Sequence, residues 1–197
     1  MFTGLIRFQG KFRGLRKDRT EVLIEAPDEL AAQLEIGQSL AVDGICLTVT
    51  AREKSRLSFN LSRETLDRTN LKGYRPGKTV NLEPPLRLDD LLGGHLVTGH
   101  IDGTGQVMEV KSRPLGKRLK IRIPAECRKY LVSKGSVAIN GVSLTVASLG
   151  SDWLEVELIP ATLGATNLNE LRPGDLVNLE GDIIGKYVYN FISEKKF

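Results

Sequence analysis

The chain has only two cysteines, Cys46 and Cys127, among its 197 residues. Two cysteines cannot form a disulfide framework, and neither belongs to a Cys-x-x-Cys pair or to a Cys/His pattern with metal-ligand spacing. No dinucleotide-binding motif occurs either. The sequence therefore predicts a protein with reduced thiols, no metal site and no cofactor.

Long apolar runs and a strong charge excess are also absent. No apolar stretch of about 18 residues occurs, so we expect no membrane-spanning helix. The opening MFTGLIRFQG does not resemble a signal peptide, and we expect a cytoplasmic protein.

The formal charge of +4 gives only weak support for a nucleic-acid partner, and we expect none. The basic residues of the N-terminal run lack the interleaved aromatics of a single-strand-binding surface. We interpret this run as a solvated hairpin tip, with a nucleic-acid-binding barrel as an alternative that steep salt dependence of binding would support. The run comprises Arg7, Lys11, Arg13, Arg16, Lys17 and Arg19.

An internal repeat is the strongest feature that the sequence does have. Residues 39–49 (SLAVDGICLTV) and 136–146 (SVAINGVSLTV) lie 97 positions apart and are identical at six of eleven positions. The same offset relates 69–71 to 166–168 and 80–83 to 177–180, and residues 2–4 recur as 97–99. A period of this length matches a small domain. We predict domains at 1–96, with a Pro- and Gly-containing linker, and at 97–185.

Each copy is predicted to be all-β. Asp43-Gly44 and Asn140-Gly141 stand between β-rich runs, where they favour tight hairpin turns. Short strands separated by turn residues predict a small closed barrel in each copy. The expected strands are 40–42, 45–49, 21–25, 57–61, 79–82, 105–110, 119–123, 153–158 and 176–179, with helical turns at 27–34 and 124–132.

The tail breaks the repeat. Residues 182–197 have apolar side chains at 184, 188, 191 and 192, which is helical spacing. We predict a C-terminal oligomerisation helix, assigned to 186–197, that binds another chain. The alternative is a helix that folds back on its own barrel.

Two groups of side chains could carry chemistry. Side-chain alternation puts Cys46 and Thr48 on one strand face, and Ser143 and Thr145 on the matching face of the second copy. Such a face could line a pocket for a polar heterocycle, or its residues could simply be structural. Both histidines, His95 and His100, fall in GGHLVTGH. An imidazole exchanges protons near neutral pH, although two satisfied loop histidines are the alternative.

The segments MFTGLI, GICLTV, GGHLVTGHIDG, KGSVAINGVSLTV and ATLGATNL, in this order, resemble the riboflavin synthase family, and the resemblance runs from residue 1 to about 187. It implies two six-stranded Greek-key β-barrels plus a C-terminal α-helix that holds a homotrimer, and association with lumazine synthase. It also implies a transferase of the last step of riboflavin biosynthesis. In that reaction a four-carbon unit passes between two molecules of 6,7-dimethyl-8-ribityllumazine, giving riboflavin and 5-amino-6-(D-ribitylamino)uracil without a cofactor. The implied active site lies between the first barrel of one subunit and the second barrel of its neighbour.

The resemblance also implies two substrate pockets. The first would use Gly4, Leu5, Ile6, Cys46, Leu47, Thr48, Asn60, Leu61, Ser62, Arg63, Glu64 and Thr65, with Ser39 near the acceptor. The second would use Gly99, His100, Ile101, Lys134, Ser143, Leu144, Thr145, Glu157, Leu158, Ile159, Pro160, Ala161 and Thr162.

Four of these residues are predicted to be catalytic: His100, Cys46, Ser143 and Ser39. The chemistry needs a base for the 7-methyl proton of the donor and a nucleophile for C7 of the acceptor. His100 is the candidate base, which would put the donor in the second barrel. Cys46 could assist or supply the nucleophile.

The resemblance is imperfect at two places. Asn140 stands where the family often has an acidic residue, so an acid–base role there is in doubt, and the tail after Tyr187 is short for a trimer. The main alternative function is a non-catalytic antenna that binds a lumazine or flavin. Such relatives tend to lose the pocket residues, whereas His95, His100 and Cys46 are present here.

Overall fold

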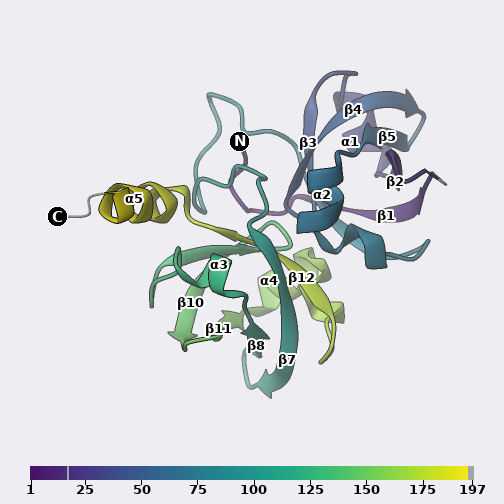
Figure 1. Cartoon of the computed structure of the whole chain (residues 1–197). Helices are drawn as coiled ribbons and strands as arrows, with labels where there is room; N and C mark the ends of the chain where they lie inside the picture. The colour runs from purple at the N-terminus through teal and green to yellow at the C-terminus, as the bar shows by residue number, and fades with distance from the viewer. Residues whose placement is uncertain (17, 195–197) are drawn as a thin grey trace.

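Each copy of the repeat folds into a closed barrel of six antiparallel strands (Figure 1). The computed structural model describes residues 1–16 and 18–194. The strand order β1-β2-β5-β4-β3-β6 of the first barrel recurs as β7-β8-β11-β10-β9-β12 in the second. The predicted fold, two tandem six-stranded barrels followed by a helix, is therefore confirmed.

The first barrel contains β1 (Phe8–Leu15), β2 (Glu21–Glu25), β3 (Ser39–Val42), β4 (Ile45–Glu53), β5 (Arg56–Asn60) and β6 (Thr79–Glu83), with helices α1 (Asp28–Gln33) and α2 (Arg63–Arg68) and the 3₁₀ turn η1 (Asn70–Gly73). The second contains β7 (Gly103–Arg113), β8 (Gly116–Arg122), β9 (Ser136–Ile139), β10 (Val142–Leu149), β11 (Trp153–Leu158) and β12 (Leu176–Gly181), with α3 (Ala125–Arg128), α4 (Pro160–Ala165) and the 3₁₀ turn η2 (Asn167–Glu170). Helix α5 (Ile183–Glu194) follows.

The basic N-terminal run belongs to the β1–β2 hairpin. β1 was not among the predicted strands, but the hairpin itself was expected. The described basic residues of the run, Arg7, Lys11, Arg13, Arg16 and Arg19, are exposed. Arg13 and Arg16 form ion pairs with Glu25 and Glu21 of β2. Lys17 of the predicted run lies outside the described residues. Two of the six basic residues of the run are thus paired with acidic residues of the same hairpin.

Alternate residues of each strand form two separate cores. In β4, for example, Ile45, Leu47 and Val49 point into the barrel, while Cys46 is half-buried and Thr48 exposed. The alternation predicted for this strand is therefore confirmed. The pairing of β4 with β5 shifts register after Val49, and β10 shifts at the corresponding place. Such bulges bend strands, which helps a short sheet to close into a barrel.

The two barrels meet at the predicted hairpin turns. Both turns have positive φ at both central residues, 46° and 80° at Asp43-Gly44 and 45° and 78° at Asn140-Gly141. A Cβ on Gly44 would lie 2.6 Å from the Gly141 nitrogen, and one on Gly141 would lie 2.7 Å from the Gly44 nitrogen. The glycines are thus needed twice, for the turn conformation and for backbone contact between barrels.

Buried amide side chains surround this contact. The Asn81 side chain donates to the Asn140 carbonyl at 3.0 Å, and the Asn178 side chain donates to the Asp43 carbonyl at 3.0 Å. Asn70 and Asn167 of the 3₁₀ turns bind the same two strand asparagines from the opposite barrel. Hydrogen bonds of buried groups depend on direction, so this network favours one orientation of the barrels.

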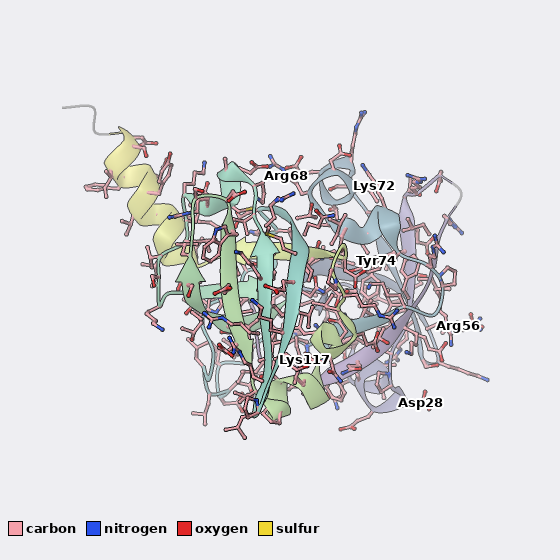
Figure 2. The ribbon with its side chains drawn as sticks, turned by 90° about the horizontal axis from the view of Figure 1, so that it is seen from below. Asp28, Arg56, Arg68, Lys72, Tyr74 and Lys117 are labelled. Atoms are coloured by element: carbon pink, nitrogen blue, oxygen red, sulfur yellow. The ribbon has the colours of Figure 1, made fainter. Side chains whose placement is uncertain are left out.

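Asp43 is the one carboxylate in this network. Its Oδ1 accepts hydrogen bonds from the Asn81 backbone and the Asn167 side chain, and the Tyr74 hydroxyl donates to Oδ2. Figure 2 shows Tyr74 among closely packed side chains. Burial raises the pKa of Asp43 to about 6. Asn140, its counterpart, is buried and accepts from the Asn178 backbone at 2.8 Å, so its position is structural.

Helix α5 projects away from both barrels (Figure 1). It begins at Ile183, three residues before the predicted boundary of 186, and residues 195–197 of the predicted helix lie outside the described residues. Lys186 pairs with Asp102 at 2.7 Å, which fixes the base of the helix to the second barrel. Within the described residues, no helix has the length and apolar character needed to span a membrane.

We predict that Asp43→Asn reduces the pH dependence of stability. An unfolded aspartate has a pKa of about 4, whereas burial raises the pKa of Asp43 to about 6. The stability that Asp43 contributes is therefore fully present below about pH 4 and is lost as the pH rises through about 6. An asparagine removes this dependence. Urea unfolding across this range should give a shallower slope for the variant, and equal slopes would contradict the prediction.

Candidate functional site

The N-terminal segment lies across the second barrel, although the first barrel follows it in the chain. The Gly4 carbonyl accepts a hydrogen bond from the Ser143 backbone at 2.8 Å. Ile6 packs against the core of the second barrel. A Cβ on Gly4, whose φ is 75°, would lie 2.6 Å from the Ser143 Cβ. This glycine therefore permits a contact that any side chain would prevent.

The segment between the barrels makes the reciprocal crossing. The Gly99 carbonyl accepts a hydrogen bond from the Cys46 backbone at 2.9 Å, and Ile101 packs against the first core. Phe2 and Val97 pair as an isolated antiparallel bridge where the two segments pass. Each barrel is thus completed by the segment that precedes the other barrel.

This exchange corrects the predicted grouping of site residues. The sequence placed Gly4, Leu5 and Ile6 with Cys46, but the segment that carries them lies beside Ser143. It placed Gly99, His100 and Ile101 with Ser143, but these residues lie beside Cys46. The repeat shows that the two segments are equivalent, yet it does not show which barrel each one covers.

A hollow of about 260 Å³ lies on the outer face of β4. Cys46 forms one wall, helix α2 with Thr65 another, and His100 a third. The Ser62 hydroxyl accepts the Thr65 backbone N–H at 3.0 Å and so caps α2 at the edge of the hollow. The full lining is Ile45, Cys46, Glu64, Thr65, Arg68, Thr69, Gly99, His100 and Ile101.

A second hollow of about 410 Å³ shares the His100 side of the first. It extends over α3 to Tyr130 and Lys186, and charged pairs line it, among them Arg68 with Glu64 at 2.9 Å. Figure 2 labels Arg68 near the edge of the molecule. The larger hollow falls within the size range of small-molecule sites, about 300–1,000 Å³, and the smaller one adjoins it on the His100 side. An aromatic heterocycle with a polar chain suits such a pair, since one end is partly apolar and the other is polar.

The second barrel carries a different arrangement at the matching face. The Ser143 Oγ and the His95 Nδ1 form a hydrogen bond of 2.7 Å. His95 is 7% exposed, and its Nε2 has no hydrogen-bond partner within the described residues. Burial lowers the pKa of His95, which favours the neutral imidazole. His95 was not among the predicted site residues, although the sequence offered a signal for it: both histidines of the chain lie in GGHLVTGH.

The other predicted site residues fall into four structural groups. Residues 60–65 join β5 to α2, and residues 157–162 join β11 to α4 at the corresponding place. Ser39 pairs with Thr48 across β3 and β4, next to the outer face that carries Cys46. Lys134 is exposed in a turn with φ of 66°. The side chains of Leu47, Leu144 and Leu158 lie in the cores, so only their backbones could reach a ligand.

The two hollows are lined by thiol, hydroxyl, imidazole and carboxylate groups and by the guanidinium and ammonium groups of Arg68 and Lys186. Among the described residues, no cluster of three or more His, Cys, Asp or Glu side chains is arranged to hold a metal ion. Proton transfer and addition of a nucleophile are what such groups can perform on a bound heterocycle.

Comparison with known families identifies these two units. The family model described as "Lumazine binding domain" matches residues 3–84 and again residues 98–182. The chain belongs to this family. The two matches correspond to the two barrels together with the crossing segments, so the family's domain is the repeat found in the sequence.

Curated relatives match nearly the whole chain. "Riboflavin synthase" of Mycobacterium tuberculosis (strain ATCC 25618 / H37Rv) is 40% identical over 194 residues, which cover 95% of this chain and 96% of the relative. "Riboflavin synthase" of Actinobacillus pleuropneumoniae is 37% identical and covers 99% and 91%. "Riboflavin synthase" of Bacillus subtilis (strain 168) is 35% identical and covers 98% and 90%.

Solved structures of LumP have the same fold. LumP complexed with 6,7-dimethyl-8-(1'-D-ribityl) lumazine gives a TM-score of 0.81 at 26% identity, covering 91% of this chain and 98% of that one. LumP complexed with riboflavin gives 0.84 at 25% identity, with 92% and 99% covered.

We predict that Gly99→Ala destabilises the protein more than Gly77→Ala does. Both glycines have positive φ, 82° and 92°, so both variants strain the backbone. Only at residue 99 would the new Cβ meet another side chain, 2.4 Å from the Cys46 Cβ, whereas a Cβ at residue 77 has no neighbour within 4 Å. Urea unfolding should show an additional loss of about 1–3 kcal/mol for Gly99→Ala. Equal losses would mean that the crossing segment moves aside freely.

Proposed function

We propose that this chain catalyses the riboflavin synthase reaction, the transfer of a four-carbon unit between two molecules of 6,7-dimethyl-8-ribityllumazine. The donor becomes 5-amino-6-(D-ribitylamino)uracil and the acceptor becomes riboflavin. The observation that carries the proposal is the match to riboflavin synthases over 95% to 99% of the chain. A duplicated scaffold, with Cys46 on one barrel and Ser143 at the matching place on the other, suits a reaction in which the same compound is both donor and acceptor.

The two substrates together contain every atom of the two products. The reaction therefore needs no external oxidant, reductant or other co-reactant. What the protein must supply is the juxtaposition of two bound heterocycles, together with groups that move protons. Orientation of two reactants alone can contribute about 7–11 kcal/mol, so the placement of the two pockets matters as much as any single side chain.

His100 and Cys46 belong to the same pocket, which changes their proposed roles. The donor was assigned to the second barrel because His100 was expected there, and that reason no longer holds. We assign both groups to the first pocket, where the imidazole removes a proton from the 7-methyl group of the donor and the thiol assists this proton transfer. Ser143, hydrogen-bonded to the neutral His95, is the corresponding proton-transfer group at the second pocket.

We also propose that the chain works as a homotrimer in which a first barrel faces a neighbour's second barrel. Helix α5 supports this proposal, because Ile184, Val188 and Ile192 are exposed along one side of it. The first turns of the helix contact their own barrel, where Lys186 pairs with Asp102 at 2.7 Å and Tyr189 meets Tyr130 edge-on at 5.7 Å. An exposed apolar face of this kind suits contact with a second copy.

The remaining parts of the proposal concern domain limits, location and partners. We propose domains at 1–96 and 97–182, the second ending just before the oligomerisation helix, which begins at Ile183 rather than at the predicted 186. A cytoplasmic location suits the two free thiols, Cys46 and Cys127. Ser39 is proposed as a further group near the acceptor, and association with lumazine synthase as a supply of substrate.

We predict that the purified chain forms one riboflavin for every two lumazine molecules consumed, with no cofactor or other co-reactant added.

We also predict that His100→Ala lowers kcat about a hundredfold and leaves riboflavin binding nearly unchanged, because the hollow keeps its other walls. Riboflavin absorbance gives the turnover, and fluorescence titration gives the binding. A stoichiometric fluorescent complex without turnover would instead support the non-catalytic antenna function; LumP, which has this fold, has been solved with the lumazine and with riboflavin bound.

We predict that Val188→Glu dissociates the assembly into monomers, because it places a charge on the exposed apolar face of α5. Ser193→Glu is the matched control, since residue 193 is exposed on the other side of the helix. Sedimentation measures the molecular mass, and monomers should lose turnover if the site spans two subunits. A monomeric natural protein, or fully active monomers, would contradict the trimer.

A further inference from the structure

Two buried glutamates occupy corresponding places in the repeat. Glu83 is the last residue of β6, and Glu180 lies near the end of β12. Their exposed fractions are only 3% and 1%. Neither was predicted as a site residue, and neither lines the two hollows at the first barrel. Burying a carboxylate is costly unless hydrogen bonds compensate, so the partners of each glutamate indicate what it holds.

Glu180 holds the segment that carries His100. Its Oε1 accepts hydrogen bonds from the backbone N–H and the hydroxyl of Thr98, both at 2.7 Å, and its Oε2 accepts from the Gly99 N–H at 3.0 Å. The Thr98 hydroxyl in turn accepts the His100 N–H at 3.3 Å. This carboxylate therefore fixes the backbone that passes over Cys46.

Glu83 holds the other crossing segment in the same way. Its Oε1 accepts from the N–H and the hydroxyl of Thr3, both at 2.7 Å, and its Oε2 accepts from the Gly4 N–H at 3.1 Å. The Leu5 N–H donates to the Thr3 hydroxyl at 3.1 Å. Leu5 thus has the place in this segment that His100 has in the other, and the segment passes over Ser143.

We propose that Glu180 and Glu83 are positioning residues, each of which acts on the pocket of the opposite barrel. Glu180 belongs to the second barrel and sets His100 beside Cys46 of the first. Glu83 belongs to the first barrel and sets the Leu5 segment beside Ser143 of the second. The chemical use of the pockets rests on the proposed function, whereas the crossed support rests on the contacts alone.

A carboxylate suits this role because it only accepts hydrogen bonds, and each glutamate faces three donors. Glutamine has the same shape but turns one acceptor into a donor. Glu180→Gln therefore breaks at least one of these hydrogen bonds. It also places the new amide N–H group against an N–H or O–H donor of the crossing segment. Losing a hydrogen bond to a charged group corresponds to a change of about tenfold or more in an equilibrium. The variant loosens the segment while changing the fold little.

The Cys46 thiol reports on the first pocket. It is half-buried beneath Gly99, so loosening of that segment should expose it to iodoacetamide. Cys127 serves as an internal reference, because it is buried and burial raises its pKa to about 12. Without ligand, Glu180→Gln should raise the rate of Cys46 alkylation about tenfold. Glu83→Gln, the matched control, should leave this rate unchanged.

The reciprocal test moves the reporter to the second pocket. The double variant Cys46→Ser with Ser143→Cys exchanges the residues at the two corresponding positions. On this background Glu83→Gln should raise the alkylation rate at residue 143, and Glu180→Gln should not. The proposal is overturned if each glutamate affects the thiol of its own barrel, or if both glutamates affect both thiols equally.

A milder pair of variants serves if the glutamine variants fail to fold. Thr98→Val keeps the size of the side chain but removes one donor to Glu180, and Thr3→Val does the same at Glu83. Thr98→Val should raise alkylation of Cys46 only. An increase at Cys46 caused by Thr3→Val would count against the crossed support.

Riboflavin in the same assay separates this inference from the proposed function. Protection of Cys46 by riboflavin tests the pocket, while the ligand-free rates test the glutamates, so either idea can fail alone.

In turnover, Glu180→Gln should lower kcat more than it changes KM, because it displaces the candidate base His100. Glu83→Gln should mainly raise KM, because Glu83 fixes the segment that carries Leu5. Equal falls in kcat would indicate a general structural role and would overturn the proposal.

Discussion

The contact between the two hairpin turns sets the geometry of the whole molecule. Gly44 and Gly141 touch backbone to backbone, and any Cβ there would lie within 2.7 Å of the opposite turn. Buried asparagines around them, such as Asn81 and Asn178, bind carbonyls of the opposite barrel. An unpaired buried amide is costly, so few other orientations of the barrels can satisfy this network. The crossing segments can be short only because the barrels are held this close.

The exchange of segments means that neither repeat makes a complete pocket alone. The first barrel provides Cys46, but Gly99 and His100, which close the hollow, are fixed by Glu180 of the second barrel. In the same way, the second barrel provides Ser143, but Gly4, which lies over it, is fixed by Glu83 of the first barrel. The functional unit is therefore the pair of barrels, although the repeated unit in the sequence is one barrel.

The fold could be predicted from the sequence because its signals are local or repeated. Asp43-Gly44 and Asn140-Gly141 indicated the turns, and alternation in residues 45–49 indicated which face is buried. The pocket assignment failed because Gly4 and Gly99 contact residues far away in the chain. The repeated VNLE segments, 80–83 and 177–180, contained a usable signal: polar Asn and Glu recur within otherwise apolar strands. Their partners, however, lie about 80 residues away or in the other barrel.

The walls of the two proposed pockets differ between the repeats. Asn70 and Asn81 recur as Asn167 and Asn178, and Glu83 recurs as Glu180. Asp43, by contrast, corresponds to Asn140, His100 to Leu5 and Cys46 to Ser143. A change in an interface residue alters the geometry of both pockets, but a change at a pocket wall alters only one. A duplicated scaffold can therefore keep two pockets in fixed relation while their chemistry diverges. A reaction that uses one compound in two roles needs this combination, because identical pockets would treat donor and acceptor alike.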